Sequence, residues 1–172
     1  MLLLSCSKSK PASGSSNAND FYIRFKANGT QLEYRANAEA SYNKQTGANY
    51  ITTLGGTKDQ FIPNKSNMTV ALTSVGVNET NITYTNYATV TAGSKKGKVL
   101  QLAFYDANGK FFMSWSDDFV LLLPAGTPFN GRLILTEATS LTLKGNFSGT
   151  MMTQDYLNKL DITDGEFYLK LR

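Results

Sequence analysis

The stretch "FYIRFKANGTQLEYRA" (residues 21–36) decides the fold class of this chain. Apolar and polar residues alternate on both sides of Asn28 and Gly29, and this period of two predicts two neighbouring strands. Asn-Gly favours a two-residue type I′ turn, in which both central residues have positive φ. The pattern therefore predicts an antiparallel hairpin that turns at Asn28 and Gly29.

The register of this hairpin follows from the turn, because residues equally distant from the turn face each other. Phe25 then lies opposite Leu32 on an apolar face, and Arg24 lies opposite Glu33 on a polar face. Apolar cross-strand pairs and opposite charges both stabilise such a pairing. The turn and the face pattern thus predict the same register.

A second stretch, "VLQLAFYDANGKFFMSW" (99–115), repeats this design. We expect its loop to be either Asn108-Gly109 or Asp106–Gly109, and both alternatives keep the apolar residues of the two strands on one side. The residues expected to face inward are Leu100, Leu102, Phe104, Phe111, Met113 and Trp115.

The rest of the chain continues the strand pattern, without helical periodicity. One segment, 153–160, has the composition for a helical turn. Many short strands without long helices are typical of an all-β sandwich or barrel. Of these we expect a single antiparallel β-sandwich of two sheets, immunoglobulin-like or jelly-roll-like, over residues 20–172. The further strands are expected at about 48–54, 68–75, 82–91, 118–123, 132–137, 140–152 and 165–172, the last with Phe167 and Leu169 inward.

The first six residues, "MLLLSC", contain the only cysteine of the chain. Leu3-Leu4-Ser5-Cys6 resembles a bacterial lipobox, which implies cleavage before Cys6 and acylation of that residue. Two or more acyl chains anchor a protein stably to a membrane. We therefore expect 1–6 to be the remnant of a lipoprotein signal ending at the lipidation site Cys6. A secretory signal needs a positive segment and about 7–15 apolar residues, so we expect the natural start to lie upstream of Met1.

Residues 7–19, "SKSKPASGSSNAN", have the composition of a flexible linker with a mean span of about 20 Å. The lipobox, this linker, the hairpin at 21–36 and the terminal "LKGNFSGT…ITDGEFYLKLR" together resemble the small uncharacterised β-sandwich lipoproteins of Bacteroidetes-type bacteria. The resemblance implies a bacterial cell-envelope address, most naturally at the outer membrane on its periplasmic or surface face. It implies no activity and supplies no catalytic residues.

Composition argues against several classes of function. The chain has 172 residues, no histidine and a net charge of +4. Histidine is the commonest general base and metal ligand, so we expect no metal site and no cofactor. The lysines cluster only in "GSKKGK" (93–98), which is typical of a solvated loop rather than of a nucleic-acid footprint. We therefore expect no nucleic-acid partner.

The acidic residues are expected to serve turns. Asp106, Asp117-Asp118 and the group Asp161, Asp164 and Glu166 lie in stretches rich in turn formers. Calcium ligation is an alternative use of these carboxylates, but no EF-hand spacing is present. Catalysis by a carboxylate pair, as in glycosidases, is another alternative, which depends on a distance that sequence does not provide.

Outward-facing aromatic residues are the best candidates for binding, because they supply rigid contact area at low entropic cost. The phase of the expected strands places Trp115 in the core. We predict a non-enzymatic binding or structural module, held to the membrane through its N-terminal lipid, with a glycan or an envelope protein as the partner. An envelope hydrolase or carbohydrate-processing enzyme that uses acidic residues is the alternative. The possible ligand contacts are Tyr22, Tyr105, Phe112 and Tyr168.

Overall fold

The structure is a computed structural model that describes residues 20–44, 49–75, 79–86, 90–91, 94–95, 99–115 and 122–172. The expectations for residues 1–6, residues 7–19, Cys6 and Asp117-Asp118 therefore lie outside the described residues. The strands are β1 (Tyr22–Ala27), β2 (Thr30–Tyr34), β3 (Ala36–Lys44), β4 (Asn49–Thr57), β5 (Asn67–Val75), β6 (Thr83–Thr85), β7 (Val90–Thr91), β8 (Ser94–Lys95), β9 (Val99–Tyr105), β10 (Phe111–Met113), β11 (Arg132–Ala138), β12 (Thr142–Met152) and β13 (Lys159–Leu171).

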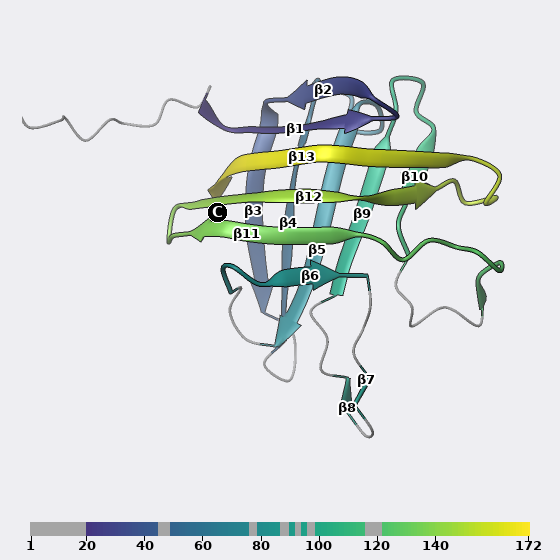
Figure 1. The fold of residues 1–172 in the computed structure, drawn as a ribbon. Helices are drawn as coiled ribbons and strands as arrows, with labels where there is room; N and C mark the ends of the chain where they lie inside the picture. The colour runs from purple at the N-terminus through teal and green to yellow at the C-terminus, as the bar shows by residue number, and fades with distance from the viewer. Residues whose placement is uncertain are drawn as a thin grey trace, which may run out of the picture.

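The all-β prediction is confirmed. The main sheet has 11 strands in the order β10-β12-β11-β6-β9-β5-β4-β3-β13-β1-β2, and β7 and β8 form a separate hairpin (Figure 1). The expectation of two separate antiparallel sheets is not met, because one hydrogen-bonded sheet includes the parallel pairs β3–β13 and β6–β9. No helix among the described residues is long and apolar enough to cross a membrane.

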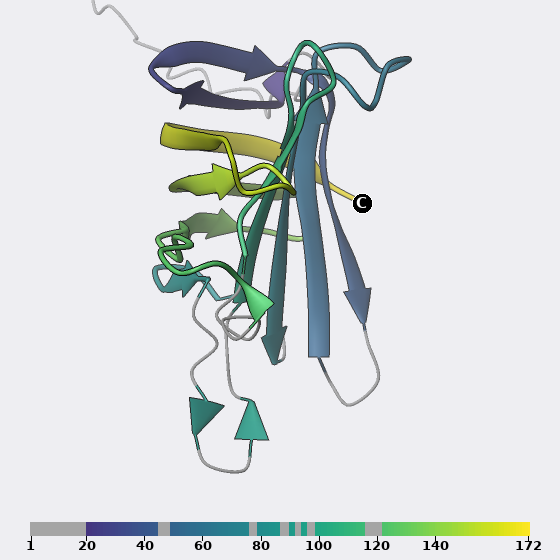
Figure 2. The same cartoon turned by 90° about the vertical axis from the view of Figure 1, so that its right-hand side faces the viewer.

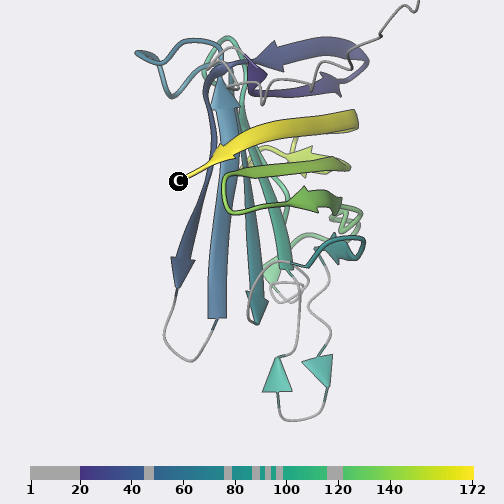
Figure 3. The ribbon, with the colours of Figure 1, turned by 90° about the vertical axis from the view of Figure 1, so that its left-hand side faces the viewer.

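The single sheet folds over on itself into two layers. Figure 2 and Figure 3 show β1, β2, β13, β12, β11 and β6 as a front layer that crosses the back layer of β3, β4, β5 and β9 at a steep angle. The sheet also returns to its start, because β12 pairs with both β11 and β13. The strands β12, β11, β6, β9, β5, β4, β3 and β13 thus form a closed ring.

The first hairpin has the predicted register. Phe25 pairs with Leu32 and Arg24 with Glu33. Asn28 and Gly29 have φ values of 46° and 82°, as a type I′ turn requires. The ion pair of Arg24, however, is with Glu166 on β13, because β1 has a neighbour on each side.

The second hairpin corrects the expected phase of 111–115. Phe112 pairs with Phe104, and Asp106 accepts a backbone hydrogen bond from Gly109. Gly109 has a φ of 81° while Asn108 does not have a positive φ, so the loop is Ala107–Gly109, with glycine in the left-handed position. An odd loop length reverses the faces of the second strand.

This correction changes which side chains fill the core. Leu100, Leu102 and Phe104 face inward as predicted, but Phe112 is buried with them, and Phe111 and Met113 are half-buried on the other side. Trp115, which lies beyond the end of β10, is half-buried and is not part of the core. The inward placement of Trp115 and the outward placement of Phe112 are therefore wrong.

Aromatic residues join the two layers. Phe25 on β1 makes edge-on contacts with Tyr34 and with Phe104 of the back layer, at centroid distances of 5.6 Å each. Phe167 and Leu169 are buried as predicted. Edge-to-face ring pairs add about 0.5–1.5 kcal/mol beyond burial, so they help to fix how the layers cross.

The structure differs from the sequence-based expectations in four further places. Residues 36–44, which the sequence pattern did not single out, form β3, and 82–91 contains two strands, β6 and β7, instead of one. Of the strand expected at 118–123, only Leu122 and Leu123 are described, and neither is in a strand. Residues 153–160 form a turn and the beginning of β13, without a helical turn.

The acidic group of β13 does not form a turn. Asp161, Asp164 and Glu166 lie within this strand, and Asp164 has a φ of 50° where the register shifts against β1. An extra residue in one strand is a β-bulge, and aspartate tolerates the left-handed conformation that it needs here. Asp106 does serve a turn, because its carboxylate accepts hydrogen bonds from the backbone N–H of Asn108 and Lys110, each at 2.8 Å.

A buried amide joins β9 to the end of β6 and the start of β11. Asn86 is fully buried, and its Nδ2 donates to the Leu100 carbonyl oxygen at 2.6 Å and to Ser114 Oγ at 3.1 Å. Its Oδ1 accepts from the backbone N–H of Gly131 at 2.5 Å. Buried polar groups of this kind are stable only when they are hydrogen-bonded, so Asn86 fixes the meeting point of these strands.

Candidate functional site

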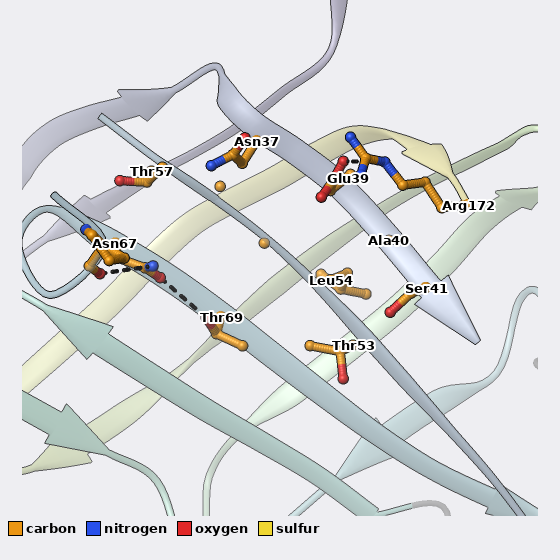
Figure 4. Close-up of a pocket in the computed structure, with 13 residues that line it drawn as sticks. Asn37, Glu39, Ala40, Ser41, Thr53, Leu54, Thr57, Asn67, Thr69 and Arg172 are labelled. Atoms are coloured by element: carbon orange, nitrogen blue, oxygen red, sulfur yellow. Dashed lines mark hydrogen bonds and ion pairs between the residues drawn. The ribbon is translucent and has the colours of Figure 1, made fainter. Parts of the chain in front are cut away.

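A shallow polar groove of about 220 Å³ lies on the outer face of β3, β4 and β5 (Figure 4). We call it the polar groove. Its lining includes hydroxyl and amide side chains, backbone and one ion pair, together with a similar share of apolar atoms such as those of Pro63. Hydrogen-bond donors and acceptors therefore lie beside apolar surface. The residues that line it are Asn37, Glu39, Ala40, Ser41, Thr53, Leu54, Gly55, Gly56, Thr57, Pro63, Asn67, Thr69 and Arg172.

Gly55 forms part of the floor of the polar groove. It is paired with Thr69 on β5, and a Cβ added at Gly55 would lie 2.3 Å from the carbonyl oxygen of Met68. The two strands approach each other here more closely than any side chain allows, and this is one of the uses of glycine in a strand. The missing side chain leaves backbone exposed at the bottom of the groove.

Asn37 reaches the groove because β3 is bulged. The register of β3 against β4 shifts between Ala36 and Glu39, and Asn37 has a φ of 49°. Bulges redirect side chains, and asparagine is among the residues that accept a positive φ. In Figure 4 the Asn37 amide lies between Thr57 and Glu39.

An ion pair closes the opposite side of the groove. Arg172 Nε lies 2.5 Å from Glu39 Oε2, and the Arg172 backbone N–H donates to the Ala40 carbonyl oxygen at 2.9 Å. This contact extends the short parallel pairing of β13 with β3. The front layer thus contributes a charged side chain to a groove on the back layer.

An aromatic pair borders the polar groove at Asn67. Asn67 is paired with Tyr105 on β9, and Tyr105 contacts Phe111 at a centroid distance of 4.7 Å. Both rings are half-buried. The Asn67 amide is held in place by a hydrogen bond from its Nδ2 to the Pro63 carbonyl oxygen at 3.0 Å. The Tyr105–Phe111 pair therefore lies on the strand next to the Asn67 end of the groove.

Tyr22 and Tyr168 lie together on the outer face of the front layer, where they are directly paired across β1 and β13. Their rings are already in contact with cations of the chain. Arg24 lies 5.1 Å from the Tyr22 ring centroid, and Lys144 lies 4.8 Å from that of Tyr168. These contacts leave less ring surface for a ligand than the sequence pattern implies.

Glu166 connects this front-face cluster. Its carboxylate accepts a hydrogen bond from the Tyr22 hydroxyl at 2.5 Å and forms an ion pair with Arg24 at 2.6 Å. The hydrogen bond from Tyr22, followed by that from Arg24, lowers the pKa of Glu166. Burial, followed by the hydrogen bond to Glu166, raises the pKa of Tyr22. Glu166 is therefore held as a carboxylate, which is the state that accepts both bonds.

An open groove of about 540 Å³ beside this cluster contains a second carboxylate. Asp164 Oδ2 lies 2.8 Å from Lys26 Nζ, so both acids of this groove are paired with cations. Within the described ranges, no group of three or more histidine, cysteine or acidic side chains is placed to hold a metal ion.

The structure thus separates the four aromatic residues predicted from the sequence. Tyr22 and Tyr168 lie on the front layer, Tyr105 lies beside the polar groove, and Phe112 is only 6% exposed in the core. Sequence reasoning missed the groove, since its residues are small, polar and spread over three strands and the end of a fourth. The adjacent glycines in "TTLGGT" (52–57) were the one local signal, because glycine in a strand often marks a close approach of backbone.

Comparison with known proteins finds no matching family model, no matching curated protein and no matching solved structure.

Proposed function

We propose that this protein is a lipid-anchored module of the bacterial cell envelope that binds a glycan in the polar groove and does not catalyse a reaction. The anchor is acylated Cys6, as the lipobox pattern indicates, and the address is the outer membrane, as the resemblance to Bacteroidetes-type lipoproteins implies. The observation that carries the binding proposal is the glycine-floored groove with the Tyr105–Phe111 pair on the strand next to its Asn67 end.

The chemistry of this surface fits a sugar chain. Asn37, Thr53 and the Glu39–Arg172 pair offer polar groups that can meet hydroxyls, and binding sites use a few such groups to fix orientation. The aromatic pair offers a flat apolar surface next to them. The groove is open and shallow, so an extended chain of sugars suits it better than a small enclosed molecule.

The front-face carboxylates support binding over the alternative, an envelope hydrolase. A glycosidase needs a general acid whose pKa is raised. Glu166 has a lowered pKa, and Asp164 is paired with Lys26. Their surroundings stabilise the charged form of Glu166, which is the opposite of what an acid catalyst needs.

The test is affinity electrophoresis of the full chain through gels that contain neutral or acidic polysaccharides. We expect one class of polysaccharide to retard the protein, and Tyr105→Ala or Thr53→Lys to weaken retardation at least about tenfold, equivalent to about 1.4 kcal/mol. Tyr168→Ala, a half-buried tyrosine on the other layer, is the matched control for Tyr105→Ala.

A further pair of variants separates the two faces. Asn37→Gly removes the groove amide and keeps the positive φ that the bulge needs. Asn146→Ala removes an exposed amide from the front layer. Loss of retardation in Asn146→Ala or Tyr168→Ala, with Asn37→Gly unaffected, would place the glycan site on the front face. Absence of retardation by every polysaccharide would contradict the proposal.

A further inference from the structure

The loop between β4 and β5, residues 58–66, presents two apolar side chains to solvent. Phe61 is 82% exposed and its neighbour Ile62 is 47% exposed. Single exposed apolar residues are ordinary, but an adjacent aromatic and β-branched pair at the tip of a loop indicates a contact with another apolar surface.

The loop is fixed by its own hydrogen bonds. The Phe61 N–H donates to Asp59 Oδ1 at 2.9 Å, and the Lys58 N–H donates to the Ser66 carbonyl oxygen at 2.9 Å. The Ser66 N–H donates in turn to the Asp106 carbonyl oxygen of the β9–β10 loop at 3.0 Å. These hydrogen bonds support the loop in the form that turns Phe61 and Ile62 outward, so less ordering is needed when they meet a partner.

Two lysines flank the apolar pair. Lys58 and Lys65 are exposed on either side of the tip, and both line an open groove of about 570 Å³ with Phe61 and Ile62. Asp59, the one acid within residues 58–66, accepts a hydrogen bond from the Phe61 N–H through a carboxylate oxygen. Apolar side chains framed by lysines are the chemistry of segments that bind the interface of an anionic membrane.

The membrane anchor of the proposed function would bring this tip within reach of a bilayer. Asp20 is 14 residues after Cys6 (20 − 6), and such a segment spans at most about 50 Å. Figures 1–3 show the β1–β2 hairpin and the 58–66 loop at the same upper end of the molecule. We propose that Phe61 and Ile62 insert into the bilayer interface beside the Cys6 anchor, so that the domain is held at two points.

Tethering is part of the inference, which rests on the membrane anchor of the proposed function. Burying one large apolar side chain contributes only about 1.5–3 kcal/mol, so the tip alone binds a bilayer weakly. A short tether raises the effective concentration of the second contact to about the millimolar range, which makes a weak contact sufficient. The experiment therefore needs the chain attached at position 6.

Cys6 is the only cysteine, so its thiol can be coupled to a maleimide lipid in vesicles without any acylating enzyme. The full chain would carry Trp115→Phe and Phe61→Trp, so that the only tryptophan reports on the tip. The matched control carries Leu157→Trp in the same background, since Leu157 is also 82% exposed but lies in the β12–β13 turn. The vesicles contain phosphatidylcholine, phosphatidylglycerol and brominated phosphatidylcholine.

We expect the emission of the position-61 tryptophan to shift to the blue and to be quenched by brominated lipid, with no change at position 157. High salt or omission of phosphatidylglycerol should reduce the effect, because Lys58 and Lys65 are then less attracted to the surface. An unchanged position-61 emission, or equal quenching at both positions, would overturn the inference. A blue shift that appears without vesicles as protein concentration rises would instead assign the tip to a second copy or to another protein surface.

Because Cys6 is coupled to the lipid chemically, the vesicle experiment does not depend on whether Cys6 is acylated in the cell. The intact mass of the protein from a membrane fraction tests acylation of Cys6. An unacylated soluble protein would contradict the anchor of the proposed function, and failure of the tip to respond on coupled vesicles would contradict only the second contact.

Discussion

The partners of an individual residue in a sheet come from both neighbouring strands, whereas the local sequence pattern predicts only one of them. Arg24 and Glu33 lie opposite each other as the alternation implies, yet Arg24 forms its ion pair with Glu166. The reason is that β1 lies between β2 and β13, and Glu166 also receives the Tyr22 hydroxyl. Local sequence can reveal the first neighbour of a strand, but the second neighbour comes from a segment more than a hundred residues away.

The Tyr22–Glu166 contact makes a prediction about pH. A carboxyl group whose pKa is lowered in the folded state contributes stability above its ordinary pKa, here 4.5, and loses this contribution as the pH falls through the lowered value. Tyr22→Phe removes the largest cause of the shift, so the pKa of Glu166 should rise towards its ordinary value. An NMR titration of the side-chain carboxyl carbon measures this directly.

Tyr105→Phe is the control, because Tyr105 lies on the back layer. It should leave the titration of Glu166 unchanged. The same pKa of Glu166 in Tyr22→Phe and in the unsubstituted protein would show that Arg24 alone sets the charge state of this carboxyl group.

The two hairpins show which elements can be predicted from sequence. The turn at Asn28 and Gly29 has two residues with positive φ, and its register followed directly from the alternation. The turn near Gly109 looks the same locally, because it also contains Asn-Gly. There the Asp106 carboxylate holds the backbone N–H groups of Asn108 and Lys110, which stabilises a loop that is one residue longer. One residue in a turn was enough to exchange the faces of a whole strand.

Phe111 and Phe112 provide a sharp test of this exchange. Phe112 is 6% exposed and Phe111 is half-buried, although they are neighbours of identical chemistry. Phe112→Ala should lower the free energy of unfolding by about 3–5 kcal/mol through lost burial and a remaining cavity. Phe111→Ala should cost about 1 kcal/mol, mainly its ring contact with Tyr105. Urea unfolding of both variants measures the difference, and a larger loss in Phe111→Ala would support the register with Trp115 inside.

At the scale of the molecule, alternation predicted strands and a common core but not how the sheet closes. The ring depends on two short parallel contacts, Thr85 with Val99 and the end of β13 with Glu39 and Ala40. The local pattern of apolar and polar residues does not indicate which distant strand will pair with a given strand in parallel. The groove is equally hidden, because it combines a bulge, a glycine floor and Arg172 at such a contact.

The closed ring of strands predicts that β12 and the contact between β13 and β3 differ in their resistance to local opening. This difference provides a test of glycan binding. β12 and β13 are paired along most of their length, whereas β13 and β3 share only the pairs at Lys170 and Leu171, so the latter contact has few hydrogen bonds to resist local opening. Native-state hydrogen exchange should therefore be slow in β12 and much faster at the Arg172 amide, which donates to the Ala40 carbonyl oxygen. A glycan that bridges Glu39 and Arg172 would stabilise this weak contact, so saturating polysaccharide should slow exchange at Arg172 while the amides of β12 change little. Equal slowing at both places would mean that the ligand stabilises the whole fold from a site elsewhere. No slowing at Arg172 would mean that the glycan does not bind across the contact between β13 and β3.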